Sequence, residues 1–379
     1  MNIIALSIPT GIGAEIGGYA GDAGAVAREF SKYFKVILNP NVVNAGILSA
    51  INENMYYTEG YAFDEFFNGK INLKPLCGED AAGNEGGDCG DDCGGDCGGV
   101  CRAQNRIGVI FDKAIPNDIL NLHLNTIDAM KIVKGYDIPY YAITEDDVGV
   151  RLLKDNSGVS TGVIENEGAL YFAAEKLIKK GCNAIAVVCY FNDECEDENY
   201  NEGCGVDPIG GIEAVISHYI AKEFMVPCAH SPAFSGLDIT FKKVNYKVAS
   251  EFISSTYLPC ILDGLSMAPG FISAARAGDE PAGGSKSGNT APGGGPCGAI
   301  SRDEVKCLIV PDGALGSKAV LSCIERGIQI CAVKNQTVLS IDCKKFKKND
   351  IIKGNGAYDI IRQFSSYQEC LNFIRKEYE

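Results

Sequence analysis

The chain has 379 residues, 46% of them hydrophobic, and a net charge of −15, so it can bury one large core or two ordinary ones. The negative charge argues against nucleic acids and anionic membranes as partners. No apolar run is long enough to span a bilayer, and no targeting segment precedes the first predicted strand, so we expect a cytoplasmic protein.

Strand-like and helix-like segments alternate along the chain. Continuous apolar runs predict strands at 2–8, 35–38, 106–111, 139–143, 184–190, 307–310 and 328–333. Amphipathic stretches predict helices near 22–34, 116–134, 167–180, 210–224, 315–326 and 367–377. Continuous apolar strands are typical of a parallel sheet covered on both faces. We therefore predict an α/β, Rossmann-like fold, a mostly parallel doubly wound sheet with helices on both faces, built as a single body or as two lobes of roughly 1–150 and 151–379.

Two segments have the composition of insertions into this body. Residues 77–101 are rich in Cys, Gly and Asp, and residues 274–299 are rich in Gly, Pro and Ser. Both are too polar to pack, so we predict that they are disordered. Cysteines recur every four residues in the first segment, which low complexity explains more simply than a metal site does.

A glycine-rich loop, residues 9–22, lies between the first predicted strand and the first predicted helix. Such a layout leaves backbone N–H groups free to hold an anion. The spacing fits neither the dinucleotide fingerprint nor the phosphate loop. We expect the loop to bind substrate through Thr10, Gly11, Gly13, Glu15, Gly17, Gly18 and Asp22.

Polar residues also follow other predicted strands. Asn44 is a candidate helix cap or a hydrogen-bond donor to a ligand. Ser317 and Lys318 offer a hydroxyl and a positive charge to a phosphate or carboxylate, although an ordinary turn with a solvated lysine explains them equally simply. Ligand sites in such sheets lie beyond the carboxyl ends of the strands, so these segments are expected to meet.

The densest group of chemically useful residues lies between positions 203 and 232. It holds two of the three histidines, His218 and His230, together with Asp207 and Glu213. Histidine suits proton transfer near neutral pH, and either acid could orient it. The alternatives are structural histidines or a divalent metal site, but the spacing matches no standard zinc motif.

Several of these motifs together resemble one family. They are the segments 9–22, 39–44, 59–62, 104–108, 205–218 and 227–233. Outside the two predicted insertions, the chain resembles the domain of unknown function 3326, a family of cyanobacteria and photosynthetic lineages. The resemblance implies a functional core at 9–22 and 205–233 and suggests a plastid-type origin, but it implies no activity.

We therefore expect an enzyme that acts on a small anionic or phosphorylated metabolite by acid/base chemistry, as a hydrolase, lyase or isomerase. His218 or His230 would exchange the proton, with Asp207 or Glu213 orienting the ring. The alternatives are a non-catalytic small-molecule binding or sensor protein and a His/carboxylate metalloenzyme. The sequence names no cofactor, assigns no metal ligand and allows a homo-oligomer.

Overall fold

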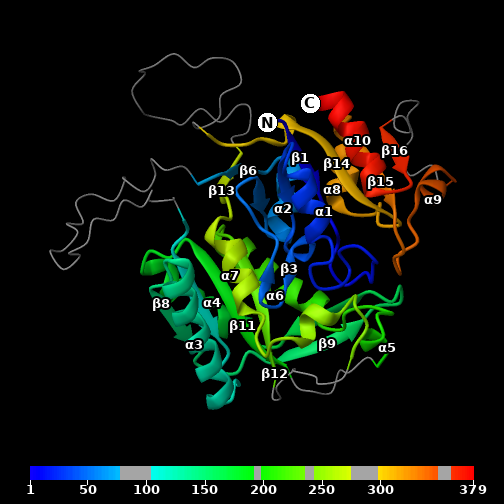
Figure 1. Cartoon of the computed structure of the whole chain (residues 1–379). Coiled ribbons are helices and arrows are strands. Elements are labelled where there is room, and N and C mark those ends of the chain that lie inside the picture. Colours follow the sequence, from blue (N-terminus) through cyan, green and yellow to red (C-terminus); the bar gives the residue numbers. More distant parts are fainter. Residues whose placement is uncertain (77–103, 192–197, 235–242, 275–297, 349–359) are drawn as a thin grey trace, which may run out of the picture.

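The computed structural model describes residues 1–76, 104–191, 198–234, 243–274, 298–348 and 360–379. The predicted insertions lie outside these residues, apart from positions 274, 298 and 299. The described part contains two parallel sheets. Elements from both ends of the chain form the upper half of Figure 1, and elements from its middle form most of the lower half.

The first sheet has six parallel strands in the order β16 (Ile361–Phe364), β15 (Gln329–Lys334), β14 (Val305–Asp312), β1 (Ile3–Leu6), β2 (Lys35–Leu38) and β5 (Met55–Tyr57). Counted along the chain, this order is 6-5-4-1-2-3, which is the Rossmann order. The order reverses between β1 and β14, so the loop after β1 leaves the sheet at its topological switch point.

The second sheet has four parallel strands in the order β12 (Cys228–Phe234), β11 (Ala184–Phe191), β7 (Ile107–Phe111) and β8 (Tyr140–Ile143). Counted along the chain, this order is 4-3-1-2, with a second reversal between β7 and β11. The first sheet combines the two ends of the chain and the second uses its middle. The sheets therefore do not follow the lobes 1–150 and 151–379.

Each sheet is covered on both faces. In the first sheet, α2 (Gly60–Asn68) and α8 (Lys318–Arg326) pack on one face, and α1 (Gly24–Phe30) and α10 (Tyr367–Tyr378) on the other. In the second sheet, α4 (Glu167–Lys179) and α6 (Gly210–Phe224) cover one face, and α3 (Asn117–Lys134) and α7 (Leu258–Ser266) the other. The predicted doubly wound, Rossmann-like α/β fold is confirmed, and every predicted strand and helix is present.

Shorter elements complete the described structure. Three pairs of antiparallel strands are β9 (Val150–Lys154) with β10 (Ser160–Ile164), β6 (Ile71–Lys74) with β13 (Gly270–Ser273), and β3 (Asn44–Ala45) with β4 (Leu48–Ser49). Two short helices are α5 (Glu198–Asn201) and α9 (Cys343–Lys348). None of the described helices is long and apolar enough to cross a membrane.

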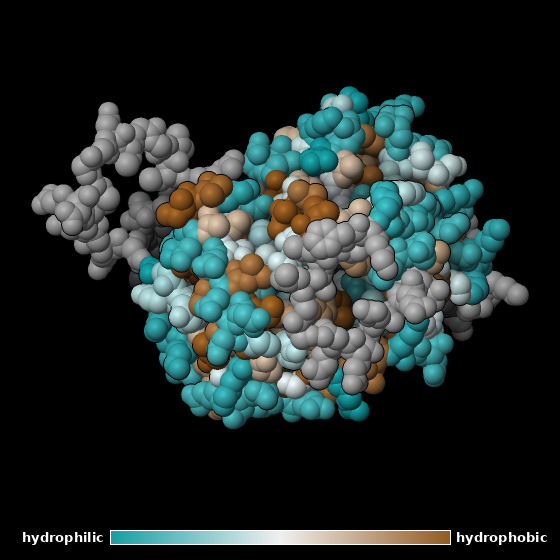
Figure 2. All heavy atoms as spheres, turned by 60° about the horizontal axis from the view of Figure 1, so that its bottom comes forward, coloured by the Kyte–Doolittle hydropathy of each residue, from teal (hydrophilic) through white to brown (hydrophobic). Residues whose placement is uncertain are grey.

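The two sheets share their cores. The helices α2 and α6 pack against each other, and one hydrophobic cluster contains buried residues from both sheets. On the face shown in Figure 2, hydrophobic residues form small separate groups among hydrophilic ones. The packing between α2 and α6 matters for function because residues beside it line the cavity of the candidate site.

The start of α6 packs unusually close to β10. A Cβ atom placed on Gly211 would lie 1.9 Å from the carbonyl oxygen of Ser160, and the Gly211 N–H donates to the Ser160 hydroxyl at 3.1 Å. Gly211→Ala should therefore destabilise the protein by at least about 2 kcal/mol, because the backbone must move to relieve the overlap. Urea unfolding measures this change.

The matched control is Gly168→Ala, at the same position of α4, where the nearest atom would be 3.6 Å from the new methyl group. Alanine is the better helix former, so this variant should be unchanged or more stable by up to about 1 kcal/mol. Equal destabilisation of the two variants would contradict the packing argument.

Candidate active site

A cavity of about 140 Å³ lies where the first sheet meets α6 and β12. Loops after β1, β2 and β5 supply one wall, and residues of α6, β12 and the segment 251–261 supply the other. Its polar lining residues are Thr10, Asn39, Asn41, Asn44, Glu59, Asp207, Glu213, Ser217, His218, His230, Glu251 and Tyr257. This is the carboxyl-end location that parallel α/β sheets use for ligands.

Glu59 joins the two halves of the site. It is 1% exposed and precedes α2, where its Oε2 accepts the N–H groups of Tyr61 at 2.7 Å and Ala62 at 3.3 Å. Its Oε1 accepts the Ser217 hydroxyl at 3.0 Å and a hydrogen bond from His218 Nδ1, both on α6. Four donors satisfy both oxygens of this buried carboxylate.

His218 is the histidine that is open to the cavity. Its side chain is 44% exposed, and Glu59 occupies its Nδ1, which leaves Nε2 for a ligand. Burial disfavours the imidazolium, but the charge and hydrogen bond of Glu59 outweigh burial and raise the pKa of His218. The ring lies against Gly60, where a Cβ atom would be 2.5 Å from Cε1. A larger residue at position 60 would displace the His218 ring.

His230 is neutral and fully engaged. The N–H of Cys189 donates to its Nε2 at 3.2 Å, so the ring proton is on Nδ1, which donates to Glu213 Oε1 at 3.1 Å. Burial lowers the pKa of His230 to about 3. Among the two predicted candidates, His218 is therefore placed for proton exchange, whereas His230 positions Glu213.

Three further carboxyl groups line the cavity. Burial raises the pKa of Glu213 to about 8. Burial, reinforced by neighbouring negative charge, also raises the pKa values of Asp207 and Glu251. The Tyr200 hydroxyl donates to Glu251 at 2.6 Å. Of the described residues that line this cavity, none is Lys or Arg. The site therefore combines carboxyl groups that hold exchangeable protons with the side chain of His218.

The structure brings together seven of the predicted site residues: Thr10, Gly18, Asn44, Asp207, Glu213, His218 and His230. Glu15 instead lines an open groove with Asp312 and Lys334. Gly11, Gly13, Gly17, Asp22, Ser317 and Lys318 are not among the residues that line the cavity. Ser317 caps α8, because its hydroxyl accepts the Val320 N–H at 3.3 Å.

Several N–H groups of the glycine loop already have acceptors within the protein. The N–H of Glu15 donates to Asn335 and Gln336, that of Gly17 to Asp22, that of Gly18 to Ala14, and that of Ala20 to Glu251. These groups are not free for an anion. The glycines instead permit close packing, since a Cβ atom on Gly13 would lie 2.2 Å from the Gly205 carbonyl oxygen.

The asparagines after β2 also serve this loop. Asn39 accepts the Ile8 N–H at 2.9 Å and donates to the Ile8 carbonyl at 2.7 Å, and Asn41 donates to the Gly17 carbonyl. Asn44 accepts the hydroxyl of Tyr57 at 3.1 Å. Neither Asn39 nor Asn41 caps a helix with its side chain. They hold the loop against β2, and the loop in turn shapes the cavity.

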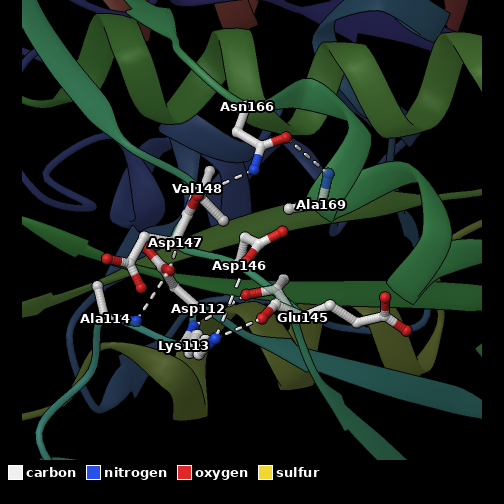
Figure 3. A network of polar contacts seen from close by, with 10 residues as sticks. Asp112, Lys113, Ala114, Glu145, Asp146, Asp147, Val148, Asn166 and Ala169 are labelled. Atoms are coloured by element: carbon white, nitrogen blue, oxygen red, sulfur yellow. Dashed lines mark hydrogen bonds and ion pairs between the residues drawn. The ribbon is translucent and has the colours of Figure 1, made fainter.

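A second polar network lies at the end of β7 and is structural (Figure 3). Asp112 accepts the N–H groups of Ala114 at 3.1 Å and Val148 at 3.0 Å. Lys113 donates to the Glu145 carbonyl at 2.6 Å and lies 3.9 Å from Asp146. These contacts fix the acidic turn after β8. Across the described part of the chain, no group of three or more His, Cys, Asp or Glu is arranged to hold a metal ion.

The sequence did not assign Glu59 and Glu251 to the site. Glu59 had one local signal, because an acidic residue before an amphipathic segment is a candidate N-cap that can also face a ligand. Glu251 had none. It follows a part of the sequence whose hydrophobic residues show neither a helical nor a strand period. Its carboxyl group is held at the cavity by hydrogen bonds from Ala20 and Tyr200.

Glu59→Gln should lower the pKa of His218 below that of an ordinary histidine, because burial remains and the carboxylate charge is lost. The histidine C–H signals in an NMR pH titration report this pKa directly, and the chain has three histidines to assign. Glu223→Gln, on the exposed part of α6, is the control and should leave the titration unchanged. An unchanged His218 in Glu59→Gln would show that the pair is not coupled.

Glu213→Gln should stabilise the fold at alkaline pH. The native pKa of about 8 exceeds the ordinary value of 4.5, so the native state holds a proton that the unfolded state has lost, and wild-type stability falls as pH rises from about 4.5 to 8. Glutamine does not titrate and still accepts from His230. We expect Glu213→Gln to gain about 1 to 3 kcal/mol over wild type between pH 5 and pH 8 in urea unfolding. A parallel pH dependence in both proteins would refute this assignment.

Comparison with known proteins places the chain in a family. An uncharacterised lipoprotein of Synechococcus sp. is 35% identical over 341 residues, which is 89% of this chain and 82% of that protein. No solved structure matches. The family model described as "Protein of unknown function (DUF3326)" matches residues 3–80 and 89–374, and omits residues 81–88 within the first predicted insertion. The chain belongs to the DUF3326 family.

Proposed function

We propose that the protein is an enzyme that acts on a small metabolite by general acid/base catalysis in the cavity between the two sheets. The observation that carries the proposal is the arrangement of His218. Its Nδ1 is held by the buried carboxylate of Glu59, and its Nε2 side is open to a cavity lined by further carboxyl groups. Enzymes that catalyse proton transfer commonly use a histidine that is oriented by a carboxylate and lies near other proton donors.

In this proposal His218 and Glu213 have different roles. His218 exchanges a proton with the substrate through Nε2, and Glu59 stabilises the imidazolium that forms. Glu213 carries a proton near neutral pH because burial raises its pKa to about 8, so it is suited to donate that proton to the substrate. Proton abstraction by one group and donation by the other fit isomerase, lyase or hydrolase chemistry.

The size of the cavity and its lining restrict the substrate. A volume of about 140 Å³ suits a molecule of a few carbon atoms, which Ile209, Ile261 and the ring of Tyr257 would contact. The anionic or phosphorylated substrate stays a prediction, and several N–H groups of the loop and of the start of α2 already have acceptors in the chain itself.

The cytoplasm remains the proposed compartment of the protein. The Synechococcus relative has the word lipoprotein in its name, and that word describes the relative.

Incubation with a metabolite extract, followed by mass spectrometry, tests the proposal. Wild-type protein should deplete at least one small compound and form a product, and His218→Gln should slow this reaction by about 100-fold or more. Glu223→Gln should keep the wild-type rate.

The alternative is a binding or sensor protein. It predicts that a compound is retained by the wild-type protein without chemical change and that His218→Gln leaves turnover absent as before. Depletion that is equally fast in His218→Gln would refute the role of His218.

A further inference from the structure

The carboxyl groups around the cavity outnumber the cationic side chains that could pair with them. Four carboxyl groups line it, those of Glu59, Asp207, Glu213 and Glu251. Glu59 has His218 as its partner, but His230 is neutral and gives Glu213 a hydrogen bond without a charge. Asp207, Glu213 and Glu251 are therefore left without a cationic side chain among the described lining residues.

The nearest lysines serve other groups. Lys247 lies over the ring of Tyr19, with its Nζ 5.7 Å from the ring centroid. Lys318 is exposed at the start of α8, beside Asp64, and is not part of the lining. Buried carboxylates are costly unless a positive charge or several hydrogen-bond donors compensate them. The protein supplies only part of that compensation from its own residues.

The hydrogen bonds that the three acids do receive leave room for a ligand. Asp207 accepts the Ile209 N–H at 3.0 Å, Glu213 accepts from His230 at 3.1 Å, and Glu251 accepts from Tyr200 at 2.6 Å and from the Ala20 N–H at 3.2 Å. The bonds to Glu213 and Glu251 fall on Oε1, whereas Asp207 also accepts the backbone N–H of Gly210. The Oε2 atoms of Glu213 and Glu251 have capacity for a further donor.

We infer that the substrate of this cavity is a small organic cation, with an ammonium or guanidinium group that binds among Asp207, Glu213 and Glu251. The inference rests on the proposed function and names the substrate class of the same site. Such a nitrogen supplies both the missing positive charge and several N–H donors. Its carbon chain would contact the apolar lining residues Ile209, Ala214 and Ile261.

Binding of a cation should release protons. The titratable groups that line the cavity are the three acids, the Glu59–His218 pair, the neutral His230 and Tyr257, and the Tyr200 hydroxyl contacts Glu251. Burial favours the protonated acids in the empty cavity, whereas a bound positive charge favours the carboxylates. A neutral or anionic ligand has no such effect, so proton release separates a cationic substrate from the other classes.

Three four-carbon probes of similar length test the inference by isothermal titration calorimetry at pH 7: putrescine, 1,4-butanediol and succinate. Putrescine should bind at least about tenfold more tightly than the other two. Its apparent enthalpy should depend on the ionisation enthalpy of the buffer in the direction of proton release. Glu251→Gln and Asp207→Asn should each weaken putrescine about tenfold or more, and Glu223→Gln should not.

The outcomes are separable from those of the proposed function. Tighter binding of succinate or 1,4-butanediol, or binding of putrescine without proton release, would overturn the cationic substrate even if His218-dependent turnover is found. Putrescine binding with proton release and no turnover of any metabolite would support the cationic ligand and count against catalysis. Urea unfolding of each variant at pH 7 confirms that a loss of binding is not a loss of the fold.

Discussion

The buried carboxylate of Glu59 is the constraint on which the site depends. It follows β5 in the first sheet, yet two of its four hydrogen-bond donors are Ser217 and His218 on α6, which covers the second sheet. A charged group that is 1% exposed is tolerated only when its donors are all in place. The same bonds that offset its burial therefore fix α2 against α6 and orient the ring of His218.

The sequence predicted the elements better than their connections. Strands such as β11 and β14 are continuous apolar runs, and the helices between them are amphipathic, so both patterns are read from composition alone. The return of β14, β15 and β16 to the sheet of β1 depends on contacts between distant residues. β12 was not predicted as a strand, because His230, Ser231 and Pro232 interrupt its apolar pattern. It is polar where it serves the cavity.

The site was predicted in part for a similar reason. Asp207, Glu213 and His218 lie close in the sequence, so their convergence in the cavity was visible as a local cluster. The glycine loop has a second explanation for its composition. A strand, a glycine-rich turn and a helix suggest an anion site, which stays a prediction, while Gly17 faces Ile8, where a Cβ atom would lie 2.5 Å from Cγ1. Sequence patterns do not distinguish a glycine that admits a ligand from one that admits a neighbouring side chain.

The glycine loop and Glu251 hold each other in place at the cavity. Ala20 and Tyr200 donate to Glu251, and Asn41 donates to the loop, so these bonds oppose any movement of the Glu251 carboxyl group toward solvent when it ionises. Functional groups held in an unfavourable environment reduce stability, and proteins retain them where a ligand offsets that cost. Here the cost is that of ionising buried carboxyl groups, and a bound cation would offset it. The site is then least stable when empty and at alkaline pH, and a bound ammonium group would restore stability while His218 remains free at Nε2 for proton transfer.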